Sequence, residues 1–238
     1  PRIPENLFSD DLIHSNTDEN RANMLSSALL ATDSRAIWCL RGGYGSHRLL
    51  PYLKKMKQPI YSKILIGISD ITSLHGFLNQ KWKWPSIHGS HLDRLGKGLV
   101  PPQVEKELLN VLEGNLRSVD FKNLKPLNEA ARLKKKILGV LVGGNMKVIE
   151  SHIGTPDKFN FSGRIAFFEE TGERGYRVDR MLFHLNESAA LKDCKAVVFG
   201  DFILGEEPLE NGQTVRQSKV EAVLKRWAEK QKFPVLSG

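Results

Sequence analysis

The chain has 238 residues, 40% of them hydrophobic and 26% charged, a balance that supports a packed core and argues against disorder. The formal net charge of +8 raises the question of nucleic acid, but few aromatic residues interleave the densest basic run, Lys134–Lys136, and no nucleic-acid-binding motif surrounds it. We therefore expect a basic surface that favours anionic substrates or solubility, and no nucleic-acid partner.

The two cysteines and the apolar runs indicate which cellular compartment to expect and whether the chain crosses a membrane. Cys39 and Cys194 both lie in apolar runs typical of strands, so we expect buried thiols and no disulfide framework. This favours a reducing compartment and a cytoplasmic location. No apolar run reaches the length of a membrane span, so no membrane partner is expected.

The first part of the chain alternates between helix and strand patterns. In chain order we expect a helix at 19–32, a strand at 36–40, a glycine-rich turn at 41–45, a helix at 46–55, a strand at 64–67 and a helix at 70–80. Two strand–turn–helix units in succession predict a parallel sheet.

The later part repeats this alternation after a break. Residues 94–134 carry no strand pattern and hold a charged helix near 103–113, so we interpret them as a connection. Expected strands then lie at 137–142, 164–168, 196–199 and 233–236, and expected helices at 176–186 and 216–231. The sequence predicts an α/β fold of two domains: a parallel-sheet domain of the Rossmann or flavodoxin-like kind at 1–95, a connection at 96–135, and a second α/β domain at 136–238.

A serine follows the strand expected at 64–67, in Gly67-Ile68-Ser69-Asp70-Ile71-Thr72. Active sites collect at the carboxyl edge of a parallel sheet, and the following helix N-terminus offers free N–H groups to an oxyanion. The stretch matches only the first half of the Gly-x-Ser-x-Gly nucleophile elbow, because Ile71 replaces the last glycine. Spacing alone favours the ordinary alternative, in which Ser69 or Asp70 caps the helix.

Three glycines follow the preceding strand, in Arg41-Gly42-Gly43-Tyr44-Gly45-Ser46. Such glycines allow close approach of the backbone. A phosphate-binding loop would need Gly-x-Gly-x-x-Gly or a Gly-Lys-Ser/Thr ending, and neither is present. The loop therefore either gives an oxyanion N–H and grips substrate, or is a tight turn between strand and helix.

Acidic and amide side chains stand at the ends of two later strands. Glu169-Glu170 follows the apolar run 165–168, where carboxyls cost desolvation unless they are paired or used. Solvated loop charge is the alternative. Gly143-Gly144-Asn145 is either a substrate-facing turn or a helix start capped by Asn145.

The seven histidines do not predict a metal site. His88 and His91 are three residues apart, but no third cysteine, histidine or carboxylate lies at zinc-ligand spacing. We expect no metal and no cofactor.

Taken in order, these pieces resemble the LD-carboxypeptidase family, which also contains enzymes that hydrolyse microcin C. Each matching stretch is short, and the ordered set makes the resemblance specific. The stretches extend over nearly the whole chain: Asn16–Arg21, Ala36–Pro51, Ile66–His75, Ile87–Gly89, Gly139–Pro156, Ile165–Leu182 and Val197–Phe202.

The resemblance implies a Ser-His-Glu triad and a site between two α/β domains. Ser69 matches the nucleophile of the family's Gly-x-Ser-Asp motif, and Glu169 matches the glutamate of its strand-end acidic pair, with Glu170 in second place. The expected oxyanion donors are the backbone N–H groups of Asp70 and Gly43. Further oxyanion or substrate contacts are expected from Gly42, Gly144 and Asn145.

The implied substrate is a murein tetrapeptide, which loses its terminal D-alanine during peptidoglycan recycling in the cytoplasm. The implied assembly is a homodimer. In the family the catalytic histidine lies in a Gly-His pair after the strand that here ends with Leu236, and none of the seven histidines takes that position. The family's opening strand is missing as well. We therefore expect a fragment of a longer protein, inactive on its own.

Two other functions stay open. Without the histidine, the chain would be a non-catalytic muropeptide-binding module. A peptidyl-nucleotide hydrolase of the microcin C type would keep the chemistry and use an aromatic clamp for the base. For that clamp we expect the region 81–99, with Trp82 and Trp84.

Overall fold

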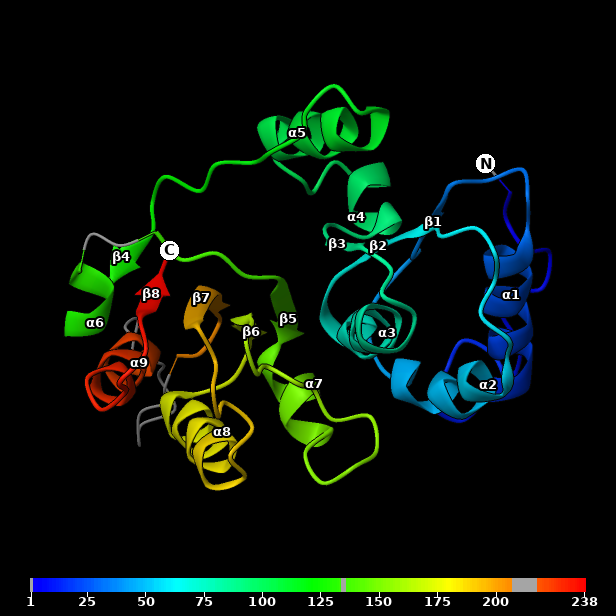
Figure 1. The fold of residues 1–238 in the computed structure, drawn as a ribbon. Helices are drawn as coiled ribbons and strands as arrows, with labels where there is room; N and C mark the ends of the chain where they lie inside the picture. Colours follow the sequence, from blue (N-terminus) through cyan, green and yellow to red (C-terminus); the bar gives the residue numbers. More distant parts are fainter. Residues whose placement is uncertain (1, 134–135, 207–217) are drawn as a thin grey trace, which may run out of the picture. The chain divides into compact units, whose positions relative to one another are not determined.

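The computed structural model describes residues 2–133, 136–206 and 218–238. The chain forms two compact units, Pro1–Ser118 and Val119–Gly238, each built around its own sheet (Figure 1). Two lysines of the basic run at 134–136, and the first two positions of the helix expected at 216–231, lie outside the described residues.

The N-terminal unit contains a parallel sheet of three strands, in the order β1 (Ala36–Trp38), β2 (Ile64–Gly67) and β3 (Ser86–His88). The parallel pairing of β1 and β2 is confirmed, and β2 has the predicted bounds. β1 ends at Trp38, two residues earlier than expected, and β3 was not predicted. The last described strand of this sheet is only three residues long, which explains its weak pattern.

Short helices follow the strands of this unit. The helix expected at 70–80 is in fact three segments of different winding, because the chain leaves β2 through a sharp turn at Ser69. In chain order the helices are α1 (Asp18–Leu30), the 3₁₀-helix η1 (Ser46–Leu49), α2 (Leu50–Lys55), the 3₁₀-helix η2 (Ser69–Ile71), α3 (Thr72–Phe77), the π-helix η3 (Leu78–Trp82), α4 (Leu92–Gly96) and α5 (Pro102–Glu113).

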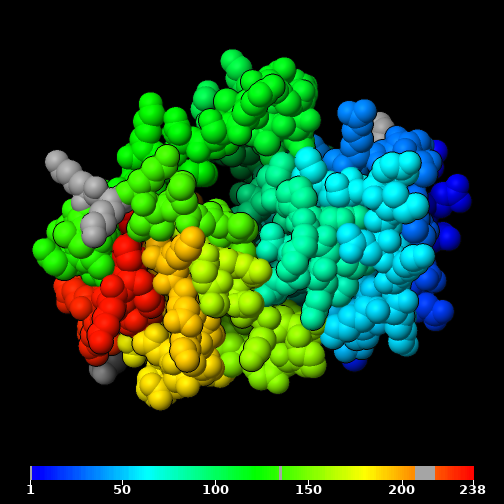
Figure 2. Space-filling model, viewed as in Figure 1, coloured from blue at the N-terminus to red at the C-terminus, as the bar shows by residue number. Residues whose placement is uncertain are grey.

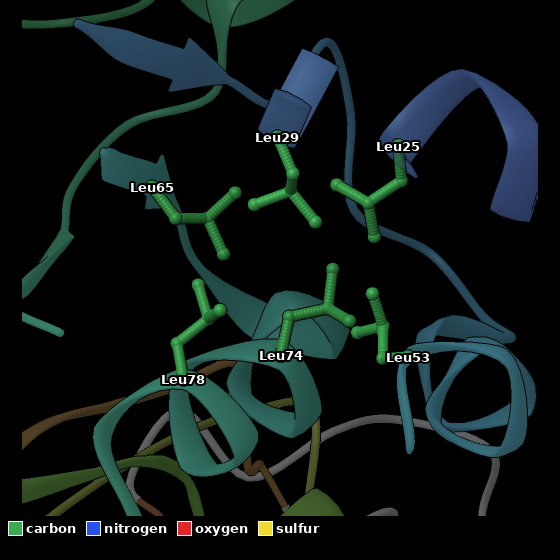
Figure 3. A pocket seen from close by; sticks show the side chains of 6 residues that line it. All are labelled: Leu25, Leu29, Leu53, Leu65, Leu74 and Leu78. Atoms are coloured by element: carbon green, nitrogen blue, oxygen red, sulfur yellow. The ribbon is translucent and has the colours of Figure 1, made fainter. Parts of the chain in front are cut away.

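Leucines from α1, α2, β2, α3 and η3 form the centre of the N-terminal core. Figure 3 shows six of them pointing toward one another: Leu25, Leu29, Leu53, Leu65, Leu74 and Leu78. They leave no room for a water molecule between them. This packing fixes α3 against β2, and therefore fixes the turn that joins the two elements. α5 buries only Leu108 and stands at the surface of its unit, in green in Figure 2.

The C-terminal unit contains a five-stranded mixed sheet in the order β4-β8-β7-β6-β5. The four strands β5 (Leu141–Asn145), β6 (Ile165–Thr171), β7 (Ala196–Ile203) and β8 (Val235–Ser237) pair in parallel. β4 (Lys125–Pro126) pairs antiparallel with β8. The interpretation of 94–134 as strand-free is therefore wrong, since two residues are too few to show a strand pattern.

β5 begins four residues later than predicted and includes Gly143, Gly144 and Asn145, which the sequence assigns to a turn or to a helix start. A Cβ atom at Gly143 would lie 1.8 Å from the carbonyl oxygen of Phe167, so only glycine fits where β5 meets β6. The sequence shows that glycines are present, but it does not show that the backbones of β5 and β6 come this close together. β6 likewise continues past Phe168 to Thr171, so Glu169 and Glu170 belong to the strand.

Aromatic rings form the core of this unit. Phe168 contacts Phe161 at 5.6 Å and Phe199 at 6.2 Å between ring centroids, and Phe199 contacts Trp227 at 5.7 Å. The helices are α6 (Glu129–Arg132), α7 (Met146–Ser151), α8 (Gly175–Glu187) and α9 (Val220–Ala228). The predicted α/β class is confirmed.

The remaining composition-based expectations concern cysteines and membranes. Both cysteines are free thiols. Cys194 is buried, as predicted, whereas Cys39 keeps some exposed surface, and desolvation raises the pKa of Cys39 to about 12. Among the described helices, none combines the length and the apolar character that crossing a bilayer requires.

Candidate active site

Ser69 lies in a strained turn between β2 and the helices η2 and α3. Its φ of 60° puts a non-glycine residue in the left-handed region. Such a conformation costs about 1 kcal/mol or more and persists only when the surrounding packing holds it. A serine on a sharp strand-to-helix turn is the structural context that the nucleophile elbow requires. The local setting predicted for Ser69 is therefore present.

The contact between Gly67 and Ile71 explains how the turn works without the last glycine of the elbow motif. A Cβ atom at Gly67 would lie 2.9 Å from the Ile71 side chain, so the isoleucine packs directly on the glycine backbone. Ile71 is 7% exposed and belongs to the leucine-rich core. The tight turn thus depends on one glycine instead of two.

The capping alternative for this serine is wrong. Ile68, not Ser69, occupies the cap position of η2, and it makes no side-chain capping bond. The carboxyl of Asp70 turns away from its own helix and accepts the backbone N–H of Ser46 at 2.8 Å. The Ser46 hydroxyl in turn donates to the carbonyl oxygen of Asp70.

The glycine loop lies directly against the nucleophile turn. A Cβ atom at Gly42 would lie 3.3 Å from the Cβ of Ser69, and the bonds between Asp70 and Ser46 fasten the far end of the loop. Gly43 has a φ of 114°, which favours glycine. Ser69, Asp70 and Gly42, predicted from separate stretches, are therefore brought together within one unit.

Glu169 lies at the carboxyl end of β6, beside Asn145 of β5. The register between β6 and β7 shifts between Phe168 and Glu170, so an irregularity in the ladder falls at this residue. Burial, together with the neighbouring carboxyls of Glu170 and Asp201, raises the pKa of Glu169 to about 7, although a hydrogen bond with Asn145 acts in the opposite direction. This is not a solvated loop charge.

Glu170 is a buried carboxyl that organises the same strand end. It is 5% exposed, and its two oxygens accept hydrogen bonds from the Asn145 amide at 3.0 Å, the Lys147 N–H at 2.9 Å and the Thr171 N–H at 2.8 Å. Burial raises its pKa, although these bonds act in the opposite direction. Glu170 therefore joins β6 to the start of α7.

Asn145 caps α7, as one of the two alternatives had it. Its side-chain oxygen accepts the Val148 N–H at 3.0 Å while its amide donates to Glu170. Gly144, one residue earlier in β5, has a φ of 142° and pairs with Phe168. The substrate contacts expected of both residues stay predictions.

The structure overturns the aromatic clamp expected at 81–99. Trp82 is 8% exposed and Trp84 4% exposed, and their rings contact each other at 5.0 Å between centroids. Trp82 also packs on Phe77. Both indoles belong to the core of the N-terminal unit, so neither presents a face to a nucleobase.

Three residues that the sequence did not predict surround the nucleophile turn: Ser46, His75 and His91. Ser46 follows the glycine loop, and only its hydrogen bonds with Asp70, 24 residues away in sequence, show that it anchors the loop. His75 and His91 each contact the backbone just before Ser69. Within the described ranges, no three side chains of the His, Cys, Asp or Glu type gather closely enough to hold a metal ion.

A two-unit α/β fold with a serine on a strained strand-to-helix turn is typical of hydrolases that use a serine nucleophile. The N-terminal domain model of the LD-carboxypeptidase family matches residues 2–89, and the C-terminal domain model matches residues 138–238. The chain belongs to the LD-carboxypeptidase family.

Among relatives, a Rickettsia conorii protein whose carboxypeptidase name is provisional is 41% identical, over 78% of this chain and 59% of its own length. The murein tetrapeptide carboxypeptidase of Pseudomonas aeruginosa is 33% identical, over 78% of this chain and 62% of its own length. The chain thus spans about six-tenths of the length of these curated relatives.

A solved muramoyltetrapeptide carboxypeptidase from Oxalobacter formigenes is 27% identical, with a TM-score of 0.73, over 96% of this chain and 76% of that one. A structure of MccF in complex with glutamyl sulfamoyl guanosine has a TM-score of 0.71 at 20% identity, over 97% of this chain and 74% of that one. The second likeness concerns the fold alone.

Proposed function

We propose that the protein carrying this sequence is a serine carboxypeptidase that hydrolyses the L,D-peptide bond to the terminal D-alanine of murein tetrapeptides. The observation that carries the proposal is Ser69, held in a strained turn at the carboxyl end of β2 with the glycine loop against it. The name of the Pseudomonas aeruginosa relative supports the substrate class. A homodimer in the cytoplasm is part of the same proposal.

In the proposed mechanism an imidazole takes the proton of the Ser69 hydroxyl, and the Ser69 oxygen attacks the substrate carbonyl. The backbone N–H groups of Asp70 and Gly43 stabilise the oxyanion, each donor contributing about 3–4 kcal/mol. The imidazolium then gives its proton to the departing amine of D-alanine. Water hydrolyses the acyl-enzyme, with the imidazole again acting as the base.

Glu169 is proposed to orient that imidazole and to stabilise its protonated form. In the C-terminal unit alone, burial and the nearby carboxyls of Glu170 and Asp201 raise the pKa of Glu169 to about 7, so the carboxyl keeps its proton below that pH. A cation placed beside this carboxyl would lower its pKa and restore the carboxylate. The acidic strand end is therefore electrostatically suited to an imidazolium.

The catalytic histidine is proposed to belong to the Gly-His pair that the family carries after the strand matched by β8, and so to be none of the seven histidines of this chain. The basic character of the chain, with a formal net charge of +8, suits a muropeptide that carries several carboxylates.

The test compares four proteins on a murein tetrapeptide, with D-alanine release as the readout. They are the present chain, an extended form that also carries the family's Gly-His pair after β8, and the extended form with Ser69→Ala or Ser73→Ala. We expect turnover only in the extended form and in its Ser73→Ala control, a serine on α3 that is 2% exposed. We expect Ser69→Ala to lose about 10⁴-fold or more in kcat.

Turnover by the Ser69→Ala protein would reject the nucleophile. Turnover by the present chain would reject the placement of the histidine. Tight binding of the tetrapeptide by the extended form without any turnover would favour the muropeptide-binding module instead.

A further inference from the structure

Two histidines of the N-terminal unit contact consecutive backbone groups immediately before Ser69. β2 ends at Gly67, and the chain then passes through Ile68 into the strained serine. The carbonyl of Gly67 meets a ring nitrogen of His75, and the peptide groups of Ile68 meet a ring nitrogen of His91. Neither histidine has a part in the triad proposed above.

His75 reaches the strand end from α3. Its Nε2 lies 2.8 Å from the carbonyl oxygen of Gly67. A carbonyl oxygen only accepts, so Nε2 carries the hydrogen and donates, which fixes the tautomer of the neutral ring. The side chain is 5% exposed, so this bond is shielded from water.

His91 reaches the same turn from the loop after β3 and also supports the glycine loop. Its Nε2 lies 3.0 Å from the carbonyl oxygen and 3.3 Å from the amide nitrogen of Ile68, so a neutral ring bonds this residue in either tautomer. A Cβ atom at Gly42 would lie 2.6 Å from Cε1 of His91. The imidazole therefore packs against both the nucleophile turn and the glycine loop.

The two rings add contacts to a backbone that is already partly bonded. The Gly67 carbonyl also accepts the Gly89 N–H, and the Ile68 carbonyl also accepts the Ile71 N–H, each at 3.2 Å. An apolar residue in place of His75 would therefore leave the Gly67 carbonyl with a donor and would avoid burying a polar ring. An apolar residue in place of His91 would remove the ring nitrogen that reaches both polar groups of the Ile68 peptide. Together the contacts of the two rings restrict the backbone that precedes Ser69.

We infer that His75 and His91 are positioning residues that hold the strained turn of Ser69 and the adjoining glycine loop in a reactive arrangement. The inference rests on the proposed role of Ser69 as nucleophile. Both residues act through the backbone, and neither touches the reacting atoms.

The groups around the two rings favour the neutral form. Burial lowers the pKa of His75 to about 4 and also lowers the pKa of His91. The His88 ring lies 6.1 Å from that of His75, while Asp93, Arg94 and Arg41 act on His91 with opposing signs. We therefore expect both rings to stay neutral, and their contacts with the Gly67 and Ile68 backbone to stay the same, around neutral pH.

The kinetic test uses the extended form defined above, with His75→Leu, His91→Leu, and the Gln variant at each position. Glutamine keeps a side-chain N–H that reaches as far as Nε2, whereas leucine does not. We expect each Leu variant to lower kcat by about 10- to 100-fold with KM unchanged, because a small misplacement of the nucleophile acts on the chemical step. Each Gln variant should recover most of this loss.

His152→Leu is the matched control, since His152 is also 5% exposed but packs on Phe159 in the C-terminal unit. It should lose stability without losing kcat. Leu variants with wild-type kcat, or Gln variants no better than Leu at equal folded fraction, would overturn the inference.

A second measurement is independent of turnover and separates the inference from the proposed function. Amide hydrogen exchange at Ile71, whose N–H bonds the Ile68 carbonyl, should be faster in His91→Leu than in wild type and His152→Leu. If Ser69→Ala kept full turnover, the proposed function would fail. The exchange rate at Ile71 would still test whether His91 holds the turn before Ser69. Unchanged exchange at Ile71 would overturn the role of His91 whatever the kinetics.

Discussion

The nucleophile turn and the acidic strand end use burial in opposite ways. Beside Ser69 the two buried histidines are bases, and burial lowers the pKa of His75 to about 4. At the end of β6 they are acids, and burial raises the pKa of Glu169 to about 7. In both places the low-dielectric interior disfavours the charged form. The N-terminal unit thus holds neutral donors in a fixed frame, whereas the C-terminal unit holds a carboxyl that gains from a cation.

Of the changes at the acidic strand end, the loss of the Glu169 carboxyl is expected to have the largest effect on activity. We expect Glu169→Gln to lower kcat on a tetrapeptide by on the order of 10²–10⁴-fold, because an amide neither orients the imidazole correctly nor stabilises its cation. At neutral pH the same change should stabilise the C-terminal unit by about 1–3 kcal/mol, since it removes an acid that ionises more readily in the unfolded chain than in the folded unit.

Glu170→Gln is the matched comparison, and its effect on stability should have the opposite sign. Both oxygens of Glu170 accept hydrogen bonds, so either orientation of an amide turns its NH₂ group toward an N–H donor. We expect a loss of about 1–3 kcal/mol, measured by denaturant unfolding. Equal stability changes in the two variants would show that the carboxyls do not differ in the way described.

The next effect concerns the backbone contact between β5 and β6. Gly143→Ala would place a Cβ atom 1.8 Å from the Phe167 carbonyl oxygen, and we expect it to destabilise the C-terminal unit by several kcal/mol. Gly96→Ala in α4 is the control, because a Cβ atom there meets nothing within 4 Å. Thermal unfolding of both variants measures the difference, and a Gly143→Ala protein as stable as Gly96→Ala would contradict the close approach.

The last difference between the two units concerns how their stability depends on pH. Unfolded His75 takes up a proton near pH 6.5, but the folded residue does so only near pH 4, so the N-terminal unit loses stability as the pH falls through this range. Unfolded Glu169 loses its proton near pH 4.5, and the folded residue near pH 7. Its contribution is therefore full below pH 4.5 and is lost as the pH rises to about 7.

Urea unfolding followed residue by residue with NMR resolves the two units across this range. His75→Gln should flatten the profile of the N-terminal unit, and Glu169→Gln that of the C-terminal unit, each by on the order of 2–3 kcal/mol at most. Profiles that run in the same direction in both units would break the comparison.

Local patterns were sufficient for the elements whose signal lies in neighbouring residues. The apolar run Ile64–Gly67 and the amphipathic stretch of α8 appear where they were predicted. The prediction failed where contacts across the sheet decide the outcome. β5 includes Gly143 because β6 leaves no space there for a side chain, and β4 pairs with β8, which is remote in sequence.

The sequence by itself determined the alternation of helices and strands, the family, and the positions of Ser69, Asp70, Glu169 and Glu170 at strand ends. These follow from composition, spacing and ordered motifs along the chain. Only the tertiary structure decided that Ser69 is strained, that Gly42 and His91 adjoin it, and that Glu170 anchors α7 while burial keeps a proton on Glu169. Strain, burial and hydrogen bonding depend on distances between residues remote in sequence, which a linear pattern does not contain.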